Sequence, residues 1–268
     1  MAQISVNELT TYRWSFDEDV RNYLEAGIQA MGVWREKLAD FGEERGIEML
    51  RDHQVRVSSL LWAGGFTGSD GRSYKESVND ARHAIRLAGA LGARCLVVYS
   101  GGRGIHTHNH ARRLLRSALT DLLPLADEFG VDLAIEPMHA GCAGNWTFLT
   151  SLDDTLAFIQ SLDSPRVKLT FDSYHLAHDP RILERIAEIV PWTAIVQVGD
   201  GRTPPNGEQN RCPLGDGCLP LKELVRAFVA NGYDGFFDVE LLGEDVEAAD
   251  YRDLLRKSRA FLESALSS

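Results

Sequence analysis

The sequence predicts a single closed barrel of eight parallel strands, each followed by a helix: the (β/α)8 or TIM-barrel fold class. Three observations carry this prediction. Short apolar stretches alternate along the chain with longer stretches of helical period. Four of the later apolar stretches bear a carboxylate or an amide, Glu136, Asp172, Gln197 and Glu240, at or near their carboxyl ends. The length of 268 residues suits one barrel, which typically needs about 250.

The first half of the chain predicts four strand–helix units. We expect strands at residues 4–9, 28–34, 55–62 and 95–99. Ser15 with Glu18 three residues later forms a capping box that starts the first helix. Further helices are expected at 42–52, around residues 78–91 and at 111–129, the last with Pro124 inside it, where a kink is expected.

The second half repeats the same unit. Strands are expected at residues 131–136, 167–172, 194–199 and 235–240, with helices near 153–162, 181–189, 219–231 and 250–265. Glycines stand just before several strands, where helix C-caps belong. Because no linker or shift in composition divides the chain, residues 1–268 are expected to form one domain.

An open, doubly wound sheet is the competing architecture, because alternating strands and helices are common to both folds. The glycine-rich loop at residues 101–104 lacks the G-x-G-x-x-G spacing that opens a dinucleotide site. An open sheet would also spread the four polar strand ends along one edge, whereas a barrel gathers them at one point. The barrel is therefore the better prediction.

Composition narrows the class of protein. The net charge of −11 argues against nucleic acid as the main partner, since nucleic-acid backbones require a basic surface. No stretch reaches the length of a membrane span, and the N-terminus resembles no export signal. The four cysteines form no CxxC pair and are expected to be reduced thiols. These features predict a cytoplasmic protein with 44% hydrophobic residues, enough for a large core.

The four polar strand ends predict a metal site. Each alone is equally well explained as a solvated strand end or a helix cap. Together, the carboxylates of Glu136, Asp172 and Glu240 and the amide of Gln197 make a hard oxygen shell. Such a shell favours Mn²⁺, with Mg²⁺ or Co²⁺ as alternatives, over tetrahedral zinc.

Other polar and aromatic residues near strand ends are candidate substrate contacts. His139 and His175 each follow a predicted ligand by three residues, and Arg211 lies in a loop rich in Gly and Pro after the seventh strand. Each could also be an ordinary loop residue. Aromatic faces pack against the C–H faces of sugars, so Trp14, Trp62 and Trp146 are candidate pocket walls, although core packing explains a tryptophan equally well.

Several motifs resemble the xylose-isomerase-like barrel family. They are AIEPMH at 134–139, TFDSYH at 170–175, VQVGD at 196–200, Arg211 with PLGDG at 213–217, and FDVE at 237–240. This resemblance spans nearly the whole chain. It implies one divalent metal held by Glu136, Asp172, Gln197 and Glu240, with Gln197 where many members have histidine. The histidine-rich three-metal site and basic groove of endonuclease IV relatives are not matched, which argues against nucleic-acid repair.

The family resemblance implies isomerisation or epimerisation of a sugar, sugar phosphate or keto-cyclitol through an enediolate beside a carbonyl. Glu136 and Glu240 would then remove and return a proton on opposite faces of the substrate carbon. Two alternatives stay open. One is a lyase that uses the same first step, either a keto-inositol dehydratase or an enzyme of 3-keto-glycoside β-elimination, with His139 or His175 as acid; the other is a non-catalytic sugar-binding subunit. A homo-oligomer is compatible with the sequence, which does not determine the oligomeric state.

Overall fold

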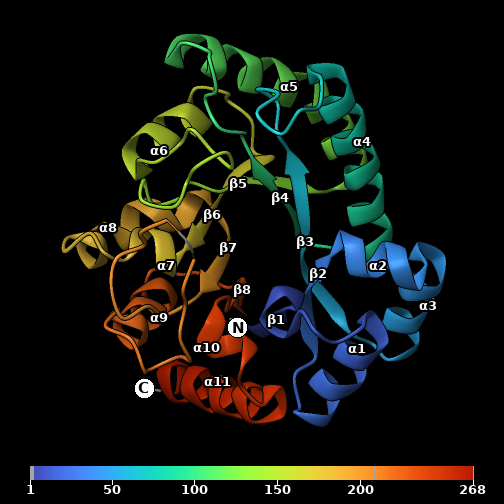
Figure 1. Ribbon diagram of the computed structural model, residues 1–268, viewed down its shortest axis with the longest axis vertical. Helices are drawn as coiled ribbons and strands as arrows, with labels where there is room; N and C mark the ends of the chain where they lie inside the picture. Colours follow the sequence, from blue (N-terminus) through green and yellow to red (C-terminus); the bar gives the residue numbers. More distant parts are fainter. Residues whose placement is uncertain (1–2, 208, 268) are drawn as a thin grey trace.

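The computed structural model describes residues 3–207 and 209–267, and these form a closed barrel of eight parallel strands in the order β1 to β8 (Figure 1). Pairing of Gln3–Val6 in β1 with Phe236–Val239 in β8 closes the ring. The strands are β1 (Gln3–Asn7), β2 (Ala30–Trp34), β3 (Arg56–Gly64), β4 (Cys95–Tyr99), β5 (Asp132–Ile135), β6 (Val167–Asp172), β7 (Thr193–Val198) and β8 (Phe236–Val239). The predicted fold class is confirmed.

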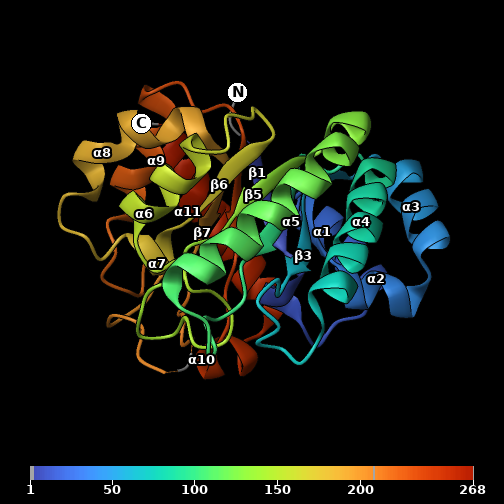
Figure 2. The same cartoon turned by 90° about the horizontal axis from the view of Figure 1, so that it is seen from above.

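Helices surround this ring on its outside (Figure 1). They are η1 (Glu8–Thr11), α1 (Phe16–Glu25), α2 (Arg35–Phe41), α3 (Glu43–Asp52), α4 (Tyr74–Leu91), α5 (His108–Phe129), α6 (Leu152–Gln160), α7 (Ser173–Leu176), α8 (Ile182–Ile189), η2 (Val190–Trp192), α9 (Leu221–Ala230), α10 (Glu244–Glu247) and α11 (Tyr251–Leu266). The N-terminus and α10 lie at opposite ends of the barrel (Figure 2), so α10 marks the end at which the strands finish.

Local sequence signals fix where the helices begin and end. Ser15 and Glu18 form the predicted capping box of α1, and Ser73 forms a second one with Glu76 at α4. Gly92 and Gly130 end α4 and α5 in the left-handed conformation, with φ of 64° and 68°. A side chain at either glycine would be strained, which explains why these two helices stop just before a strand.

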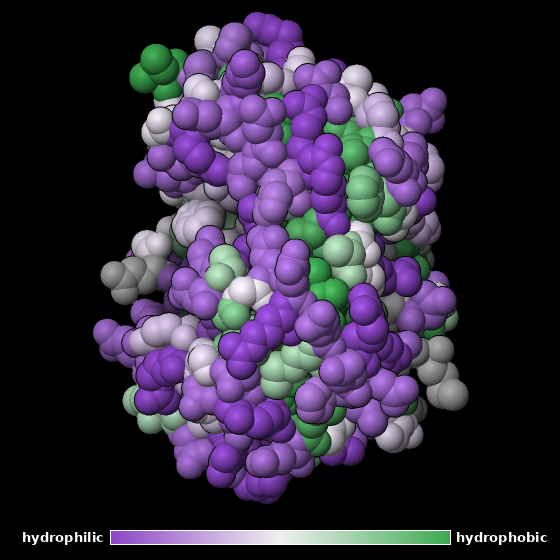
Figure 3. Space-filling model, turned by 90° about the vertical axis from the view of Figure 1, so that its right-hand side faces the viewer, coloured by the Kyte–Doolittle hydropathy of each residue, from purple (hydrophilic) through white to green (hydrophobic). Residues whose placement is uncertain are grey.

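The main apolar core lies between the strands and the helices, and includes residues of both. Two smaller apolar clusters are separate from this core and contribute to the barrel interior: one holds Cys95, Ala134, Ala194 and Ile195, and the other holds Leu9, Leu61 and Val97. On the side of the molecule shown in Figure 3, hydrophilic side chains predominate and apolar side chains lie in small groups. Within the described residues, no helix is both long and apolar enough to cross a membrane.

Most predicted bounds differ from the observed ones by one or two residues, and those of the helices α2 and α5 differ more. The segment after β2 forms the helix α2, although residues 35–41 were not expected to be helical. It follows Trp34 directly, without a side-chain cap, and it is anchored by the buried Leu38 and Lys37. The helix α5 begins at His108, three residues early, because the Thr107 hydroxyl accepts a hydrogen bond from the amide of His110.

Candidate metal and substrate site

The four polar residues predicted at strand ends all lie at one end of the barrel. Asp172 is the last residue of β6, Gln197 is the penultimate residue of β7, and Glu136 and Glu240 directly follow β5 and β8. Backbone hydrogen bonds extend the sheet to both glutamates, from Glu136 N to Val98 O and from Glu240 N to Val198 O, each 3.1 Å long. All four side chains are buried, so the sheet itself holds them in place.

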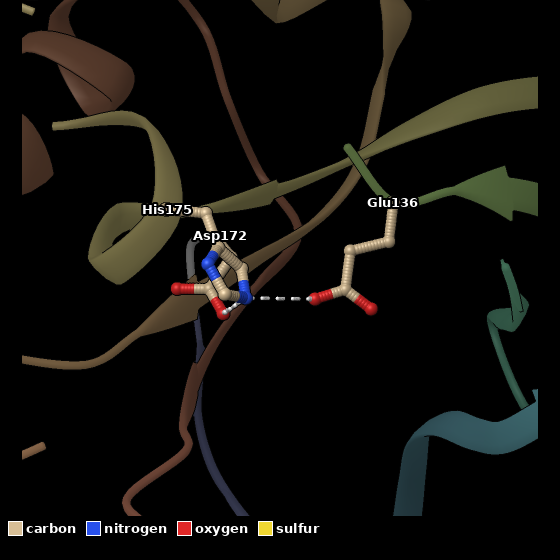
Figure 4. A group of neighbouring side chains, drawn as sticks. All are labelled: Glu136, Asp172 and His175. Atoms are coloured by element: carbon tan, nitrogen blue, oxygen red, sulfur yellow. Dashed lines mark ion pairs between the residues drawn. The ribbon is translucent and has the colours of Figure 1, made fainter. Parts of the chain in front are cut away.

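His175 joins Glu136 and Asp172 in a compact group (Figure 4). One potential ligand atom from each of the three lies within 4.8 Å of the others. The imidazole Nε2 is 3.8 Å from both Glu136 Oε1 and Asp172 Oδ2. The short helix α7 provides this geometry, because Asp172 caps it by accepting a hydrogen bond from the amide of Tyr174, and His175 follows one turn later.

Arg211 lies between two of the carboxylates. Its Nη2 atom is 2.8 Å from Asp172 Oδ2 and 3.2 Å from Glu240 Oε1, and its Nη1 atom donates to the backbone oxygen of Glu240 at 2.9 Å. The guanidinium is buried and stacks over the ring of Tyr174, 4.8 Å from its centroid. The structure therefore places this loop arginine inside the cluster, where the sequence suggested only proximity.

Glu240 also receives two amide donors. Gln197 Nε2 donates a short hydrogen bond to Glu240 Oε2, and Asn7 Nδ2 donates to the same oxygen at 2.9 Å. The Oε1 atom of Gln197 is buried and has no hydrogen-bond partner. A buried acceptor without a donor costs free energy, which a cation at this position would offset.

A further buried carboxylate, Asp238, lies below Glu240 inside the barrel. It accepts hydrogen bonds from Ser5 Oγ at 2.5 Å, from Ser58 Oγ at 3.1 Å and from Asn7 Nδ2 at 3.2 Å. Asn7 thus links Asp238 to Glu240. Gly32 makes room for this carboxylate, since a Cβ at that position would stand 2.9 Å from Asp238 Oδ2.

The sequence did not lead us to predict that Asn7 and Asp238 form a hydrogen-bonded layer below Glu240. A signal for Asp238 was present, because alternation along a strand puts residues 238 and 240 on the same face, so the FDVE motif sends both carboxylates into the barrel. No comparable signal marked Asn7. It ends an apolar strand, where its side chain is equally suited to capping the next turn, and its Oδ1 atom does accept from the amide of Leu9.

Burial and like charge shape the electrostatics of the cluster. Burial, reinforced by Glu240 and Asp172, raises the pKa of Glu136 well above its usual value. Burial also raises the pKa of Glu240, to about 8, although Arg211 opposes this shift. Burial lowers the pKa of His175 to about 4, so its imidazole is neutral near pH 7. Three carboxylates therefore share one guanidinium, so the cluster can hold all three in the ionised form at low cost only when a cation is also bound.

The residues present fit a divalent cation. Carboxylate oxygens of Glu136, Asp172 and Glu240 supply negative charge, and Gln197 Oε1 and His175 Nε2 are buried polar atoms without a hydrogen-bond partner. Such a donor set, rich in oxygen with one neutral imidazole, suits Mn²⁺ and also tolerates zinc. His175 is thus placed to be a ligand as well as a substrate contact.

The histidines and tryptophans predicted to contact substrate lie in three places: four of them line two cavities, and Trp14 packs against a helix. His139 and His175 both line a cavity of about 360 Å³ beside α7. Trp62 and Trp146 line a second cavity of about 570 Å³, and their ring centroids are 5.5 Å apart. Trp14 instead packs edge-on against Tyr251 of α11, with the ring centroids 5.2 Å apart. The structure groups two of the three tryptophans and sets Trp14 apart from them.

Comparison with known proteins connects this architecture to one family. The family profile described as "Xylose isomerase-like TIM barrel" matches residues 20–265. No curated protein matches the sequence.

Solved structures resemble the chain over nearly its full length. A protein from Sinorhizobium meliloti 1021 is 27% identical with a TM-score of 0.90, and 98% of each chain is covered. The IolI protein, solved with a bound zinc atom, is 17% identical with a TM-score of 0.84, covering 99% of this chain and 98% of its own. An L-ribulose 3-epimerase is 20% identical with a TM-score of 0.81, covering 100% of this chain and 95% of its own. The two likenesses below 25% identity concern the fold.

Proposed function

The chain belongs to the xylose isomerase-like TIM-barrel family, and we propose that it is a divalent-metal-dependent isomerase or epimerase of a carbohydrate or cyclitol. The observation that carries this proposal is the buried group of Glu136, Asp172 and His175, whose potential ligand atoms lie within 4.8 Å of one another. Glu240 shares Arg211 with Asp172, and the Oε1 atom of Gln197 is buried without a hydrogen-bond partner. A structure similar to this one belongs to a protein that epimerises a ketose, and another binds zinc.

Glu136, Asp172, Gln197 and Glu240 would hold the metal, with His175 beside them. A bound divalent ion supplies positive charge that stabilises the negative charge developing on the oxygen of a carbonyl substrate. Mn²⁺ is the ion we propose, because oxygen donors predominate in this cluster.

Glu136 and Glu240 would move the proton. They extend from β5 and β8, on different sides of the cluster, so a substrate carbon between them could lose its proton to one carboxylate and regain it from the other. Arg211 would hold a substrate oxygen or help to neutralise the enediolate, while the buried walls exclude water.

The lyase alternative is less well supported. Elimination needs an acid that protonates the leaving group, and His175 lies among the proposed metal ligands, where its imidazole is less available for that role. His139, which shares the cavity with His175, would have to serve instead. The carboxylate pair needs no such addition to perform an epimerisation.

The test is proton exchange in D₂O. Purified protein, with its metal content measured directly, would be incubated with a panel of ketoses and keto-cyclitols, with and without Mn²⁺, and followed by NMR. We expect metal-dependent incorporation of deuterium at a carbon next to the carbonyl. An added alkene or lost water would identify a lyase. If the protein binds metal and no substrate exchanges or reacts, the proposal is wrong.

A further inference from the structure

The cavity that contains Trp62 and Trp146 lies beside the carboxylate cluster, although none of the proposed metal ligands lines it. We call it the aromatic pocket. Its volume is about 570 Å³, and the residues used below are Trp34, Trp62, Tyr99, Trp146, Arg35 and Arg72. Trp34 and Tyr99 are the last residues of β2 and β4, and Trp62 lies two residues before the end of β3. The pocket therefore borders the same end of the barrel as the carboxylates.

The aromatic pocket and the cluster meet at neighbouring strands. In the pairing of β4 with β5, Val98 is opposite Ile135, so the next pair along is Tyr99 and Glu136. Tyr99 lies two residues after Val97, and Glu136 lies two residues after Ala134. Because side chains alternate between the faces of a strand, Tyr99 and Glu136 point to the barrel interior as Val97 and Ala134 do. The loop after β5, which carries Trp146, is joined to the loop after β4. The backbone oxygen of Trp146 accepts a 2.9 Å hydrogen bond from the amide of Gly101.

The walls of the pocket are suited to a ring with C–H faces. The ring of Trp146 stands 5.5 Å from that of Trp62 at 55° and 5.5 Å from that of Tyr99 at 71°. Trp146 is 42% exposed, which is unusual for a residue that is large and apolar. Trp62, which also packs against the apolar cluster of Leu9, Leu61 and Val97, therefore lines the pocket together with Tyr99 and the exposed Trp146, and aromatic walls of this kind are typical of a binding site.

The charges of the pocket favour a neutral ligand. Arg35 makes a two-pronged pair with Asp80, at 2.7 and 3.1 Å. Arg72 contacts Asp70 at 2.7 Å and Asp80 at 3.1 Å, and its Nη2 atom donates to the hydroxyl of Tyr99 at 2.7 Å. Both guanidinium groups are therefore neutralised before any ligand arrives.

Two further carboxylates, Glu36 and Glu43, also line the pocket, so two arginines face four carboxylates and the lining has a net charge of −2. A phosphate or a carboxylate ligand would be repelled. Paired planar groups can still exchange hydrogen bonds with neighbouring hydroxyl groups, which is what a sugar ring presents.

We propose that the aromatic pocket binds a second, neutral sugar ring, so that the substrate is a glycoside rather than a free monosaccharide or a sugar phosphate. The inference rests on the proposed function, which places the carbonyl-bearing unit at Glu136 and Glu240. The pocket lies within the range of about 300–1,000 Å³ in which small-molecule sites fall, so it has room for a second ring next to that unit.

The test compares one ketose with and without a second ring. Probes are D-fructose and the disaccharides turanose, maltulose, leucrose and isomaltulose, in which a glucosyl ring is attached to different hydroxyls of fructose. Two quantities are measured with the Mn²⁺-loaded protein: kcat/KM for deuterium exchange, and saturation transfer from the protein to the glucosyl protons by NMR. The variants are Trp146→Ala and, as the matched control, Trp192→Ala, which lies at the opposite end of the barrel before β7.

We expect at least one disaccharide to exceed fructose in kcat/KM by about 10-fold and to show saturation of its glucosyl ring. Trp146→Ala should reduce this preference and the glucosyl saturation, and Trp192→Ala should change neither. If the protein exchanges fructose but no disaccharide is preferred or saturated at its glucosyl ring, the inference is wrong while the proposed function stands. Saturation of the glucosyl ring that depends on Trp146, without exchange in any of these probes or in the keto-cyclitols of the first panel, would instead overturn the proposed function and keep the pocket.

Discussion

The two halves of the barrel mouth use the same charged residue types in opposite ways. In the half formed by β5 to β8, Glu136, Asp172 and Glu240 share the single guanidinium of Arg211, and the pKa values of both glutamates are raised. In the half formed by β2 to β4, contacts with arginines outweigh burial and lower the pKa values of Asp70 and Asp80. The ratio of arginine to carboxylate, together with burial, thus decides whether the pKa values of the carboxyl groups in each half are raised or lowered.

This difference has a chemical consequence. Paired charges in the aromatic half are stable without a ligand and can act as a fixed hydrogen-bonding surface. The unbalanced charges of the carboxylate half are costly without a cation, because buried ions of like sign repel one another and lose their hydration. Each prediction below changes a residue of one half, or of the layer below it, and is compared with a reference substitution elsewhere in the molecule.

The largest expected effect comes from Glu240→Gln. The substitution is nearly isosteric and keeps an oxygen that can face a metal, but an amide cannot accept the substrate's proton. Losing a positioned general base typically lowers the rate by ~10²–10⁴-fold. The measurement is deuterium exchange of the substrate proton, with metal occupancy determined on the same sample.

The matched substitution in the aromatic half is Glu43→Gln, which should lower exchange of an unsubstituted ketose far less. A fully metal-loaded Glu240→Gln variant that exchanges at the wild-type rate would show that Glu240 is a structural ligand only. The base would then have to be Glu136 or His175.

The second prediction concerns Arg211→Met. Removing this cation leaves Asp172 and Glu240 buried without their partner, and breaking a buried pair costs about 3–5 kcal/mol. Thermal unfolding of the metal-free protein should show this loss. Mn²⁺ should raise the melting temperature of the variant more than that of the wild type, because the ion replaces the missing positive charge.

Arg35→Met is the reference for that experiment. Its pair with Asp80 is partly exposed, with side-chain exposures of 18% and 32%, so the loss should be at most about 1 kcal/mol. Mn²⁺ should stabilise this variant no more than the wild type. Equal stabilisation of both variants by Mn²⁺ would mean that the ion does not bind next to Arg211.

The third prediction tests the layer below the carboxylates. Asn7→Ala removes a donor from both Asp238 and Glu240, and a hydrogen bond to a charged group contributes about 1.5–3 kcal/mol, or roughly 10-fold to 100-fold in rate. If Asn7 positions Glu240, kcat should fall while KM changes little. Ser5→Ala, which removes a contact to Asp238 only, should have a smaller effect on kcat. Equal effects of both variants would indicate a purely structural layer.

The barrel and the four strand-end residues could be predicted because their signals are local. Strand and helix periods, capping residues and the position of a carboxylate at the end of an apolar strand are all visible within a few residues. The strands at Cys95–Tyr99 and Val167–Asp172 were predicted with their observed bounds for this reason.

Long-range partners could not be predicted. Asn7 meets Glu240 across 233 positions of sequence, and Arg35 meets Asp80 across 45, so no window of sequence contains either pair. The surplus of charge in one half and its balance in the other depend on these partners. The sequence therefore located the carboxylates but could not distinguish paired carboxylates from unpaired ones.

The smallest expected effect comes from Asp80→Asn in the aromatic half. The aspartate pairs with Arg35 and Arg72, both partly exposed, and each arginine keeps another acceptor, the backbone oxygen of Trp62 or the carboxylate of Asp70. We expect a loss of at most about 1 kcal/mol in the free energy of unfolding. With one carboxylate neutralised, the pocket should tolerate an anion better, so exchange of fructose 6-phosphate relative to fructose should rise above the wild-type ratio. Asp245→Asn, which removes the partner of Arg202 from another surface pair, is the control and should leave that ratio unchanged. A wild-type protein that already prefers fructose 6-phosphate to fructose would contradict the neutral pocket, and the contrast between the two halves would then have to be drawn differently.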